Sequence, residues 1–431
     1  MLSLPRRIAA ETVRRPLFSY VQEPPSLASI EGSRSLVGTS SNSLVSEYEG
    51  SFAALVGPGG AVSFAGGRMA FFALMRALEI GQGDEVILPG YTCSVMANAV
   101  LRVGATPVFS DIETTTLGSD PGGIEHSLSS RTRMIVAQHS FGYACEISLI
   151  KAIAQAAQVF LLEDCATSLG TTVDGVRVGD FGDASIFSTD HTKPINTLIG
   201  GLIYSRNSDL IARIRTDSEN SPELPIAKQQ AILNRLLVES SYSPPSRQWR
   251  LKARDTAMGP VSRMSHATTP FLDEDYLPSP GPGTYPYPAR FPSFLALLGL
   301  QQTAGWPQLA SRRVANLGIL RDSLAKTSSG RFLPPVLTDP RQVIVPLRLA
   351  WSQPDAARIR MLIHPFTTSE GTWFMNPIVA TPADPEDFGY LWGTCPAAEL
   401  VGPDMVNVPV PSRQADAQQL SELLLRALPS L

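Results

Sequence analysis

The sequence predicts an α/β protein built on a mostly parallel sheet, and three observations carry that prediction. From about Ser46, segments with helical periodicity alternate with short apolar segments that are bounded by Gly, Pro or Asp. About six of these apolar segments precede residue 217, which is enough for one twisted sheet. The chain of 431 residues is longer than one core usually serves, so we also expect a smaller C-terminal α+β domain.

The strands and helices are expected in alternating order along the first half of the chain. The expected strands are 85–88, 106–109, 134–138, 159–162, 184–187 and 201–204. The expected helices are 69–78 and 149–157, followed by one that begins near 294 and a last one at 416–427. This alternation is typical of a parallel sheet covered by helices.

Changes in composition divide the chain into four expected regions. We expect residues 1–45 to form an N-terminal arm and residues 46–216 to form the large domain. Residues 217–288 are rich in Ser, Pro, Gln and Arg, with one apolar helical segment at 232–238, which is typical of an insertion or lid. Residues 289–431 then form the C-terminal small domain.

Charge and cysteine content exclude several classes of protein. The net charge of −4, without a sustained basic stripe, argues against nucleic-acid binding. The four cysteines show no CxxC pair and no metal-ligand spacing, so we expect neither a disulfide framework nor a metal, as in a reducing cytoplasm. No apolar run is long enough to span a membrane or form a signal peptide. The N-terminal arginines resemble a transit peptide, but Glu11 favours a surface arm.

The residues that follow each strand are the candidates for a site, because ligands of open α/β sheets bind beyond the carboxyl ends of the strands. Gly66 and Gly67 precede a helix that continues with Arg68 and Met69. The free main-chain N–H groups at such a helix start can hold a phosphate, although two glycines before a helix are usually only a turn. Tyr91, just after another strand, is a ring that could stack on a planar cofactor.

Asp164 follows the strand at 159–162 and has two interpretations. An acidic residue at a strand end is generally a turn or N-cap residue. A buried carboxylate that faces a pyridine nitrogen would instead keep that nitrogen protonated, so that the ring can act as an electron sink.

Lys193 is one of only five lysines, and it lies on a loop that begins directly after the strand at 184–187. A lysine there is more often a surface charge, but a recessed amine that loses its proton can form a Schiff base. Ser188, five residues earlier, could donate to a phosphate. His191 is more typical of a structural role.

Taken in order, these segments resemble the DegT/DnrJ/StrS family of pyridoxal 5'-phosphate (PLP)-dependent sugar aminotransferases. The resemblance runs from about Val45 to the C-terminus. Its motifs are Gly81–Pro89, Ala97–Ile112, His139-Ser140-Phe141-Gly142, Glu163-Asp164, Gly179–Asp183 leading to Phe187-Ser188 and Lys193, Arg290-Phe291 with Ala296–Leu300, and Val406–Val410. It implies the fold-type-I aminotransferase architecture, with a large domain around a mostly parallel seven-stranded sheet and a smaller C-terminal domain.

The resemblance also implies roles for individual residues. Lys193 would carry the cofactor as a Schiff base and move the proton during amine transfer, while Asp164 would pair with the ring nitrogen. Ser188 and the amides of Gly67, Arg68 and Met69 would hold the phosphate. Arg290 and His191 are weaker candidates for contacts with substrate or with a second subunit. The implied partners are glutamate or glutamine as amino donor, a keto sugar, probably nucleotide-linked, as acceptor, and a second copy of the chain in a homodimer.

Four positions depart from the family pattern. Cys93 stands where many members carry an aromatic ring that stacks on the cofactor, and Thr167 stands where they carry Gln or His. Pro288 replaces an Asn that reaches the neighbouring subunit, and Pro194 replaces an Asn or Asp. The interpretation of Tyr285, Tyr287 and Arg290 as interface residues therefore competes with plain packing of a Pro-Tyr-rich loop.

Two other functions compete with amine transfer. The first is a PLP-dependent dehydratase, but the dehydratases of this family have His in place of the catalytic lysine, so Lys193 argues against it. The second is a non-catalytic protein that keeps the fold, and the substitutions at 93, 167, 194 and 288 motivate it.

Overall fold

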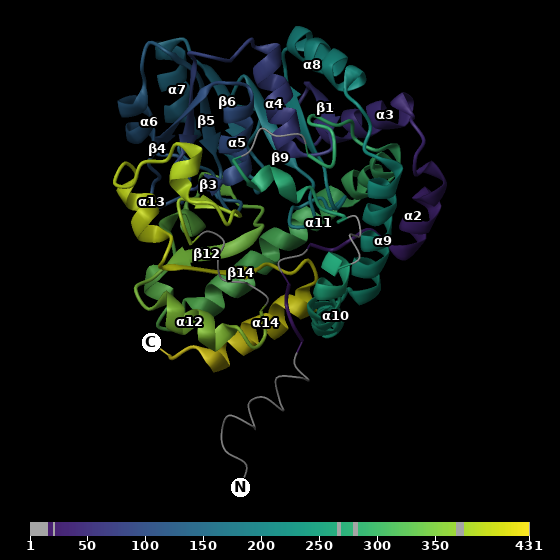
Figure 1. The fold of residues 1–431 in the computed structure, drawn as a ribbon. Helices are drawn as coiled ribbons and strands as arrows, with labels where there is room; N and C mark the ends of the chain where they lie inside the picture. The colour runs from purple at the N-terminus through teal and green to yellow at the C-terminus, as the bar shows by residue number, and fades with distance from the viewer. Residues whose placement is uncertain (1–15, 20–21, 265–268, 279–282, 368–374, 431) are drawn as a thin grey trace.

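A mixed seven-stranded sheet forms the centre of the computed structural model, which describes residues 16–19, 22–264, 269–278, 283–367 and 375–430 (Figure 1). In order across the sheet the strands are β1 (Gly60–Phe64), β10 (Gly201–Ser205), β9 (Ala184–Ser188), β6 (Phe160–Asp164), β5 (Thr132–Gln138), β2 (Glu85–Pro89) and β4 (Thr106–Ser110). β10 is antiparallel to β1 and β9, and the strands from β9 to β4 are all parallel to their neighbours. The mostly parallel sheet is confirmed.

The six strands expected from the sequence are all present, but the sequence did not indicate β1. This strand follows Gly57-Pro58-Gly59 and contains Gly, Ala and Ser, which have little strand preference of their own. Pairing with β10 along the whole strand, for example Val62 with Ile203, holds it in the sheet. Tertiary pairing has overridden local propensity here.

Helices pack against this sheet and bury its apolar strands, as a parallel sheet requires. They are α3 (Asn42–Ala53), α4 (Gly67–Ala77), α5 (Ser94–Arg102), α6 (Pro121–Ser127), α7 (Ile147–Ala157) and α8 (Ser208–Asn220). α4 packs on β10, β1 and β9, and α7 packs on β5 and β6. Every residue of β2 is buried. The position of α4 matters most for the site, because its N-terminus lies at the end of β9.

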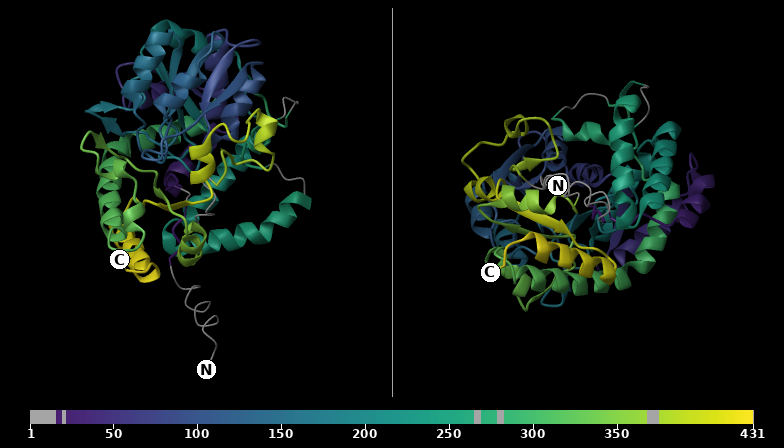
Figure 2. Two further views of the ribbon diagram at one scale, coloured as in Figure 1. Left: turned by 90° about the vertical axis from the view of Figure 1, so that its left-hand side faces the viewer. Right: turned by 90° about the horizontal axis from the view of Figure 1, so that it is seen from below.

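The segment 217–288 contains more regular structure than the sequence indicated. Where one helical segment was expected, the structure has α9 (Ile226–Tyr242), α10 (Pro245–Met264) and the short 3-10 helix η2 (Asp273–Tyr276). Ile232, Leu233 and Leu236 of α9 are fully buried within the hydrophobic core. α9 packs on α10 and on the N-terminal helix α2 (Leu27–Ser33), and Figure 2 shows these helices together at the side of the molecule.

A long helix, α11 (Ser293–Leu324), links the sheet domain to the C-terminal part. It packs on α3 and on the last helix, α14 (Gln414–Ala427). The other elements there are η3 (Gly330–Phe332), η4 (Pro335–Thr338), β11 (Gln342–Val343), β12 (Arg348–Ser352), α12 (Ala356–Ile363), β13 (Ile378–Val379), η5 (Pro385–Phe388), α13 (Pro396–Val401) and β14 (Met405–Pro409). β12 and β14 form an antiparallel pair, so the C-terminal part is α+β as expected.

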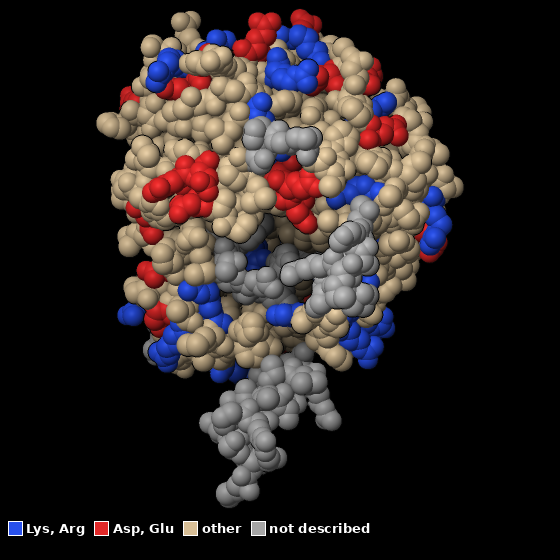
Figure 3. Space-filling view, viewed as in Figure 1, with Lys and Arg blue, Asp and Glu red and all other residues tan. Residues whose placement is uncertain are grey.

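The remaining short elements connect these two parts. They are η1 (Arg34–Leu36), β3 (Thr92–Cys93), β7 (Thr172–Val173) and β8 (Val176–Arg177). β3 pairs in parallel with β13, and β7 pairs with both β8 and β11. Figure 3 shows a hollow on the surface between the sheet domain and the C-terminal part. Within the described ranges, no helix has the length and apolar character needed to cross a membrane. The N-terminal arginines discussed above lie outside the described residues.

Candidate active site

The residues singled out by the sequence meet at the carboxyl edge of the parallel strands. Asp164 ends β6, Ser188 ends β9, Gln138 ends β5 and Pro89 ends β2. These four strands are consecutive neighbours, so their last residues lie along one edge of the sheet. Open α/β sheets bind their ligands at this edge.

The N-terminus of α4 lies directly against Ser188. A Cβ atom added to Gly67, the first residue of the helix, would lie 3.6 Å from Cβ of Ser188 and 3.3 Å from the carbonyl oxygen of Phe187. The N-cap residue is Gly66, and no side chain caps this helix end. The positive end of the helix dipole and the Ser188 hydroxyl therefore share one small space, which suits an anion such as a phosphate.

Arg68 and Met69 are already engaged with protein groups. Nε of Arg68 donates to Oδ2 of Asp275 at 2.6 Å, and its guanidinium also donates to the carbonyl of Leu272. Met69 is fully buried and its amide donates to the Gly66 carbonyl. An anion at this helix end would therefore meet the main chain of Gly67 and Arg68 rather than the Arg68 side chain.

The carboxyl group of Asp164 is buried and accepts a hydrogen bond from one main-chain amide. Only 6% of the residue is exposed, and Oδ1 accepts the amide of Ala166 at 2.9 Å. Burial raises the pKa of Asp164, while the hydrogen bond from the Ala166 amide and the positive charge of Lys193 act in the opposite direction. A cation beside this carboxylate would offset the free-energy cost of burying its charge. Asp164 therefore fits a protonated ring nitrogen.

Lys193 lies on the loop after β9, among three groups that its charge influences. Its amide donates to the carbonyl of Asp190 at 2.9 Å. Burial raises the pKa values of Cys93 and Asp164 and opposes the ionisation of Asp190, and the positive charge of Lys193 acts in the opposite direction on all three. Lys193 therefore lies within electrostatic range of Asp164, and their roles toward a cofactor stay a prediction from the sequence.

Asp190 is a site residue that the sequence analysis missed. Its Oδ1 accepts both the amide and the hydroxyl of Thr192, at 2.7 and 2.6 Å, and its Oδ2 accepts the Ser188 hydroxyl at 3.4 Å. Burial opposes ionisation, but Lys193, His191 and the Thr192 hydrogen bonds together lower the pKa of Asp190. Its position between Ser188 and Lys193 in the sequence was the available signal.

Tyr91 and Cys93 are only two positions apart in the sequence, but they lie in different surroundings. Tyr91 is fully buried in the hydrophobic core, and its carbonyl accepts the side-chain amide of Gln138 at 2.8 Å. Cys93 is the partly exposed N-cap residue of α5 and lies within range of the charges of Lys193 and Arg68. Of the two positions, Cys93 is better placed to face a ligand.

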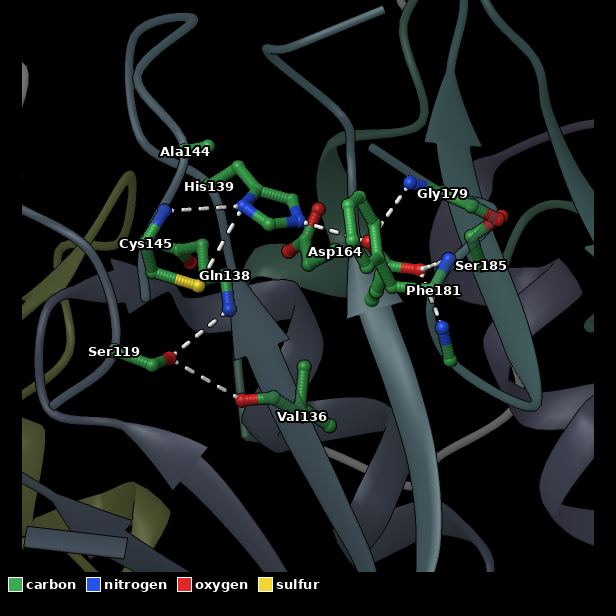
Figure 4. Close-up of polar contacts among 12 residues, drawn as sticks. Ser119, Val136, Gln138, His139, Ala144, Cys145, Asp164, Gly179, Phe181 and Ser185 are labelled. Carbon is green, nitrogen blue, oxygen red and sulfur yellow. Dashed lines mark hydrogen bonds and ion pairs between the residues drawn. The ribbon is translucent and has the colours of Figure 1, made fainter. Parts of the chain in front are cut away.

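A buried network centred on Glu163 holds the strand that ends in Asp164. Oε1 of Glu163 accepts the amides of Phe181 and Gly182, and Oε2 accepts the amide of Gly179, at 2.7 to 2.8 Å. The His139 ring completes it, with Nε2 at 3.1 Å from Oε2 of Glu163. Figure 4 shows His139 between this group and Cys145.

The hydrogen bonds of His139 fix its tautomer and limit other roles for the network. The amide of Cys145 donates to Nδ1 at 3.2 Å, so Nε2 carries the proton that is donated to Glu163. The hydroxyl of Thr167 donates to the carbonyl of His139 at 2.8 Å. His139, Glu163 and Cys165 offer ligand atoms within 4.8 Å of one another, but hydrogen bonds already occupy the Glu163 oxygens. This network therefore positions Asp164.

The two weaker candidates contact other parts of the chain. The carbonyl of His191 accepts the amide of Gln22 at 2.9 Å, and its ring lies 4.8 Å from that of Phe271, centroid to centroid. The guanidinium of Arg290 donates to Asn42, and its amide donates to the carbonyl of Pro222. These contacts of Arg290 place it beside β1 rather than among the groups around Lys193.

The segment Phe271–Tyr276 is a second feature that the sequence analysis missed. It covers the start of α4, where Asp275 pairs with Arg68 and the Tyr276 ring centroid lies 5.2 Å from the Arg68 guanidinium carbon. The one available signal was the acidic run Asp273-Glu274-Asp275 within a segment that otherwise looked like a connector.

Comparisons with known proteins identify the family and the fold of this chain. The profile of the DegT/DnrJ/EryC1/StrS aminotransferase family matches residues 33–421. The spore coat polysaccharide biosynthesis protein SpsC of Bacillus subtilis is 39% identical over 171 residues, which are 40% of this chain and 44% of that protein. GDP-perosamine synthase of Vibrio cholerae is 36% identical over 167 residues, 39% of this chain and 45% of that enzyme. The chain thus spans less than half the length of these curated relatives.

Solved structures extend the similarity to the whole fold. S. venezuelae DesV in complex with a ketimine intermediate superposes with a TM-score of 0.69 at 20% identity, covering 98% of this chain and 95% of that one. The aminotransferase from Psychrobacter cryohalolentis gives a TM-score of 0.68 at 19% identity, covering 94% and 98%. These likenesses establish the fold-type-I architecture. The match of the family profile across most of the sequence shows that the chain belongs to the DegT/DnrJ/EryC1/StrS aminotransferase family.

Proposed function

We propose that this protein is a PLP-dependent aminotransferase that moves an amino group from glutamate or glutamine to a nucleotide-linked keto sugar. The observation that carries the proposal is the meeting of Lys193, Asp164 and Ser188 at one edge of the sheet. The names of the relatives, which concern perosamine synthesis and polysaccharide biosynthesis, support a sugar as acceptor.

The residues present fit PLP at both of its ends. The Ser188 hydroxyl and the main chain at the start of α4 would hold the phosphate, since a glycine at position 67 leaves the helix end open beside Ser188. Asp164 would hold the ring nitrogen, because its buried carboxylate gains from a cation. When bound, PLP supplies an electron sink for the bond cleavage at the substrate carbon.

Lys193 and Asp164 would divide the remaining work between them. The amine of Lys193 would bind the cofactor covalently in the resting enzyme. Once released, it would move a proton between the carbon of the bound substrate and the cofactor in each half-reaction. Asp164 would keep a proton on the ring nitrogen throughout. The hydrogen bonds of Glu163 and His139 hold the strand that ends in Asp164.

The proposal is tested by the visible spectrum of the protein loaded with PLP. Addition of glutamate should convert the band of the lysine-linked cofactor into that of the amine form, and a keto sugar should restore it. Lys193→Ala should abolish the first band, whereas Lys326→Ala, at an exposed position, should leave it intact. A Lys193→Ala protein that keeps the band, or a wild-type protein that does not respond to any amino donor, would overturn the proposal.

The two competing functions make different predictions in the same experiment. A dehydratase or a non-catalytic protein would not transfer the amino group to a keto sugar. We also propose a homodimer, as the family resemblance implies, so sedimentation should give twice the chain mass of 46.4 kDa. A cytoplasmic location stays a prediction from the sequence.

A further inference from the structure

Polar contacts attach the segment Phe271–Tyr276 to the start of α4 and to α5. The side chain of Asn98 donates to the carbonyl of Asp275 at 2.7 Å, and the Ser94 hydroxyl donates to the carbonyl of Tyr276 at 3.4 Å. On the other side, Nζ of Lys228 from α9 donates to the carbonyl of Phe271. The segment is therefore held between the sheet domain and α9.

A buried ionic cluster fixes the same segment. The Asp275 side chain is 2% exposed and lies 2.6 Å from Arg68 and 3.5 Å from Arg102, whose side chains are 11% and 13% exposed. Ions taken out of water this completely need close partners, because desolvation of each one costs several kcal/mol. The position of Asp275 is thus defined by two cations, one of which belongs to the first turn of α4.

This anchoring places the next residue, Tyr276, beside Cys93. Ser94, which binds the Tyr276 carbonyl, directly follows Cys93 in the sequence. The ring of Tyr276 lies against the guanidinium of Arg68, with 5.2 Å from Cζ to the ring centroid. Burial raises the pKa of the Tyr276 phenol, the positive charge of Arg68 partly offsets this, and the carboxylate of Asp190 adds to it. The phenol is therefore within range of Cys93, of Asp190 beside Ser188, and of the start of α4.

We propose that Tyr276 forms the aromatic wall of the cofactor site on the side of Cys93, with the Arg68–Asp275 pair holding it there. The inference rests on the proposed function and deepens it: a ring borne by the 217–288 segment stands in for the one that is missing at position 93. A flat aromatic cofactor gains from contact with such a ring, as bases do when they stack on aromatic side chains.

The test is the affinity of the cofactor-free protein for PLP, measured by titration of the visible absorption band and its induced circular dichroism. Tyr276→Ala should weaken binding about tenfold and reduce the circular dichroism of the bound cofactor, whereas Tyr276→Phe should bind within about threefold of wild type. Adding Cys93→Phe to Tyr276→Ala should recover most of the affinity. Leu277→Ala, at the next and exposed position, is the matched control and should bind as wild type does.

Far-ultraviolet circular dichroism checks that each variant folds. Tyr276→Leu, which keeps apolar bulk at this position without the ring, is a second variant and should also bind PLP about tenfold more weakly. Wild-type affinity in both Tyr276→Leu and Tyr276→Ala would overturn the aromatic wall. If the visible absorption band of wild type nevertheless depends on Lys193, the proposed function stands without the aromatic wall. A wild-type protein that binds no PLP would overturn both.

Discussion

Nε of Arg68 and Oδ2 of Asp275 meet at 2.6 Å in a buried ion pair that links the first turn of α4 to the segment 217–288. The cation of this pair comes from the helix whose N-terminus faces Ser188, and the anion comes from a segment that the sequence marks as an insertion. A segment outside the sheet is thereby coupled to the phosphate end of the candidate site.

Asp275→Asn should destabilise the protein by about 3–5 kcal/mol, since it leaves two largely buried guanidinium groups without their carboxylate. Asp273→Asn, at an exposed position in the same 3-10 helix, should change stability by less than about 0.5 kcal/mol. Urea unfolding of the cofactor-free variants measures both. Equal midpoints for the two variants would contradict the ionic anchor.

Asp164→Asn should stabilise the cofactor-free protein at neutral pH while it weakens PLP binding. Burial raises the pKa of Asp164 in the folded chain, so the wild-type protein loses stability as the pH rises from the unfolded-state pKa to the folded-state pKa. The advantage of the variant should be absent below about pH 3, where the carboxyl is neutral in both states. The stability advantage of Asp164→Asn should grow as the pH rises and should level off above the folded-state pKa. Its final size should be about 1.4 kcal/mol for each unit by which folding raises the pKa of Asp164.

Unfolding free energies of wild type and Asp164→Asn from pH 4 to pH 8 measure this difference. An advantage that is the same at every pH would show that ionisation of Asp164 is not its source. An advantage that falls with rising pH would contradict the raised pKa itself.

Ser188→Ala should weaken PLP binding about 10- to 100-fold, because a hydrogen bond to a charged group is worth about 1.5–3 kcal/mol. It should also reduce the ability of inorganic phosphate to compete with PLP. Ser241→Ala, on the exposed side of α9, is the control. Competition titrations of the cofactor-free proteins decide the matter, and an unchanged phosphate constant in Ser188→Ala would place the phosphate elsewhere.

Glu163→Gln should cost about 2–3 kcal/mol of stability and loosen the loop that holds Asp164. The carboxylate accepts the amides of Gly179, Phe181 and Gly182, and a Gln side chain would turn an N–H group toward N–H donors. Hydrogen exchange of the peptide that contains these amides should rise in this variant and not in Glu125→Gln, which is exposed. Unchanged exchange would contradict the role assigned to Glu163.

Much of the fold was predictable because its strands are apolar and well punctuated. β2, β4, β5, β6, β9 and β10 all appear where the periodicity placed them. β1 was not predicted, because Gly60, Ala61 and Ser63 dilute the strand preference of Val62 and Phe64 and its place comes from pairing with β10. The buried face of α9 was indicated by the apolar segment at 232–238, whereas α10 and η2 were hidden by the polar composition of the segment around them.

The site was predictable to a similar degree and for a similar reason. Lys193, Asp164 and Ser188 follow strands, so the parallel sheet brings them to one edge. Asp275 and Tyr276 come from far along the chain and reach α4 only through tertiary packing, which no local pattern encodes. The same holds for Glu163, whose partners on the 179–182 loop are set by the fold.

The most direct test of the central claim is to identify the lysine that binds PLP. Borohydride reduction of the loaded protein, followed by peptide mass mapping, should find the cofactor on Lys193 alone. Lys228 is the informative alternative, because it is buried and burial lowers its pKa. An adduct on Lys228 or on any other lysine, or no adduct at all, would contradict the account.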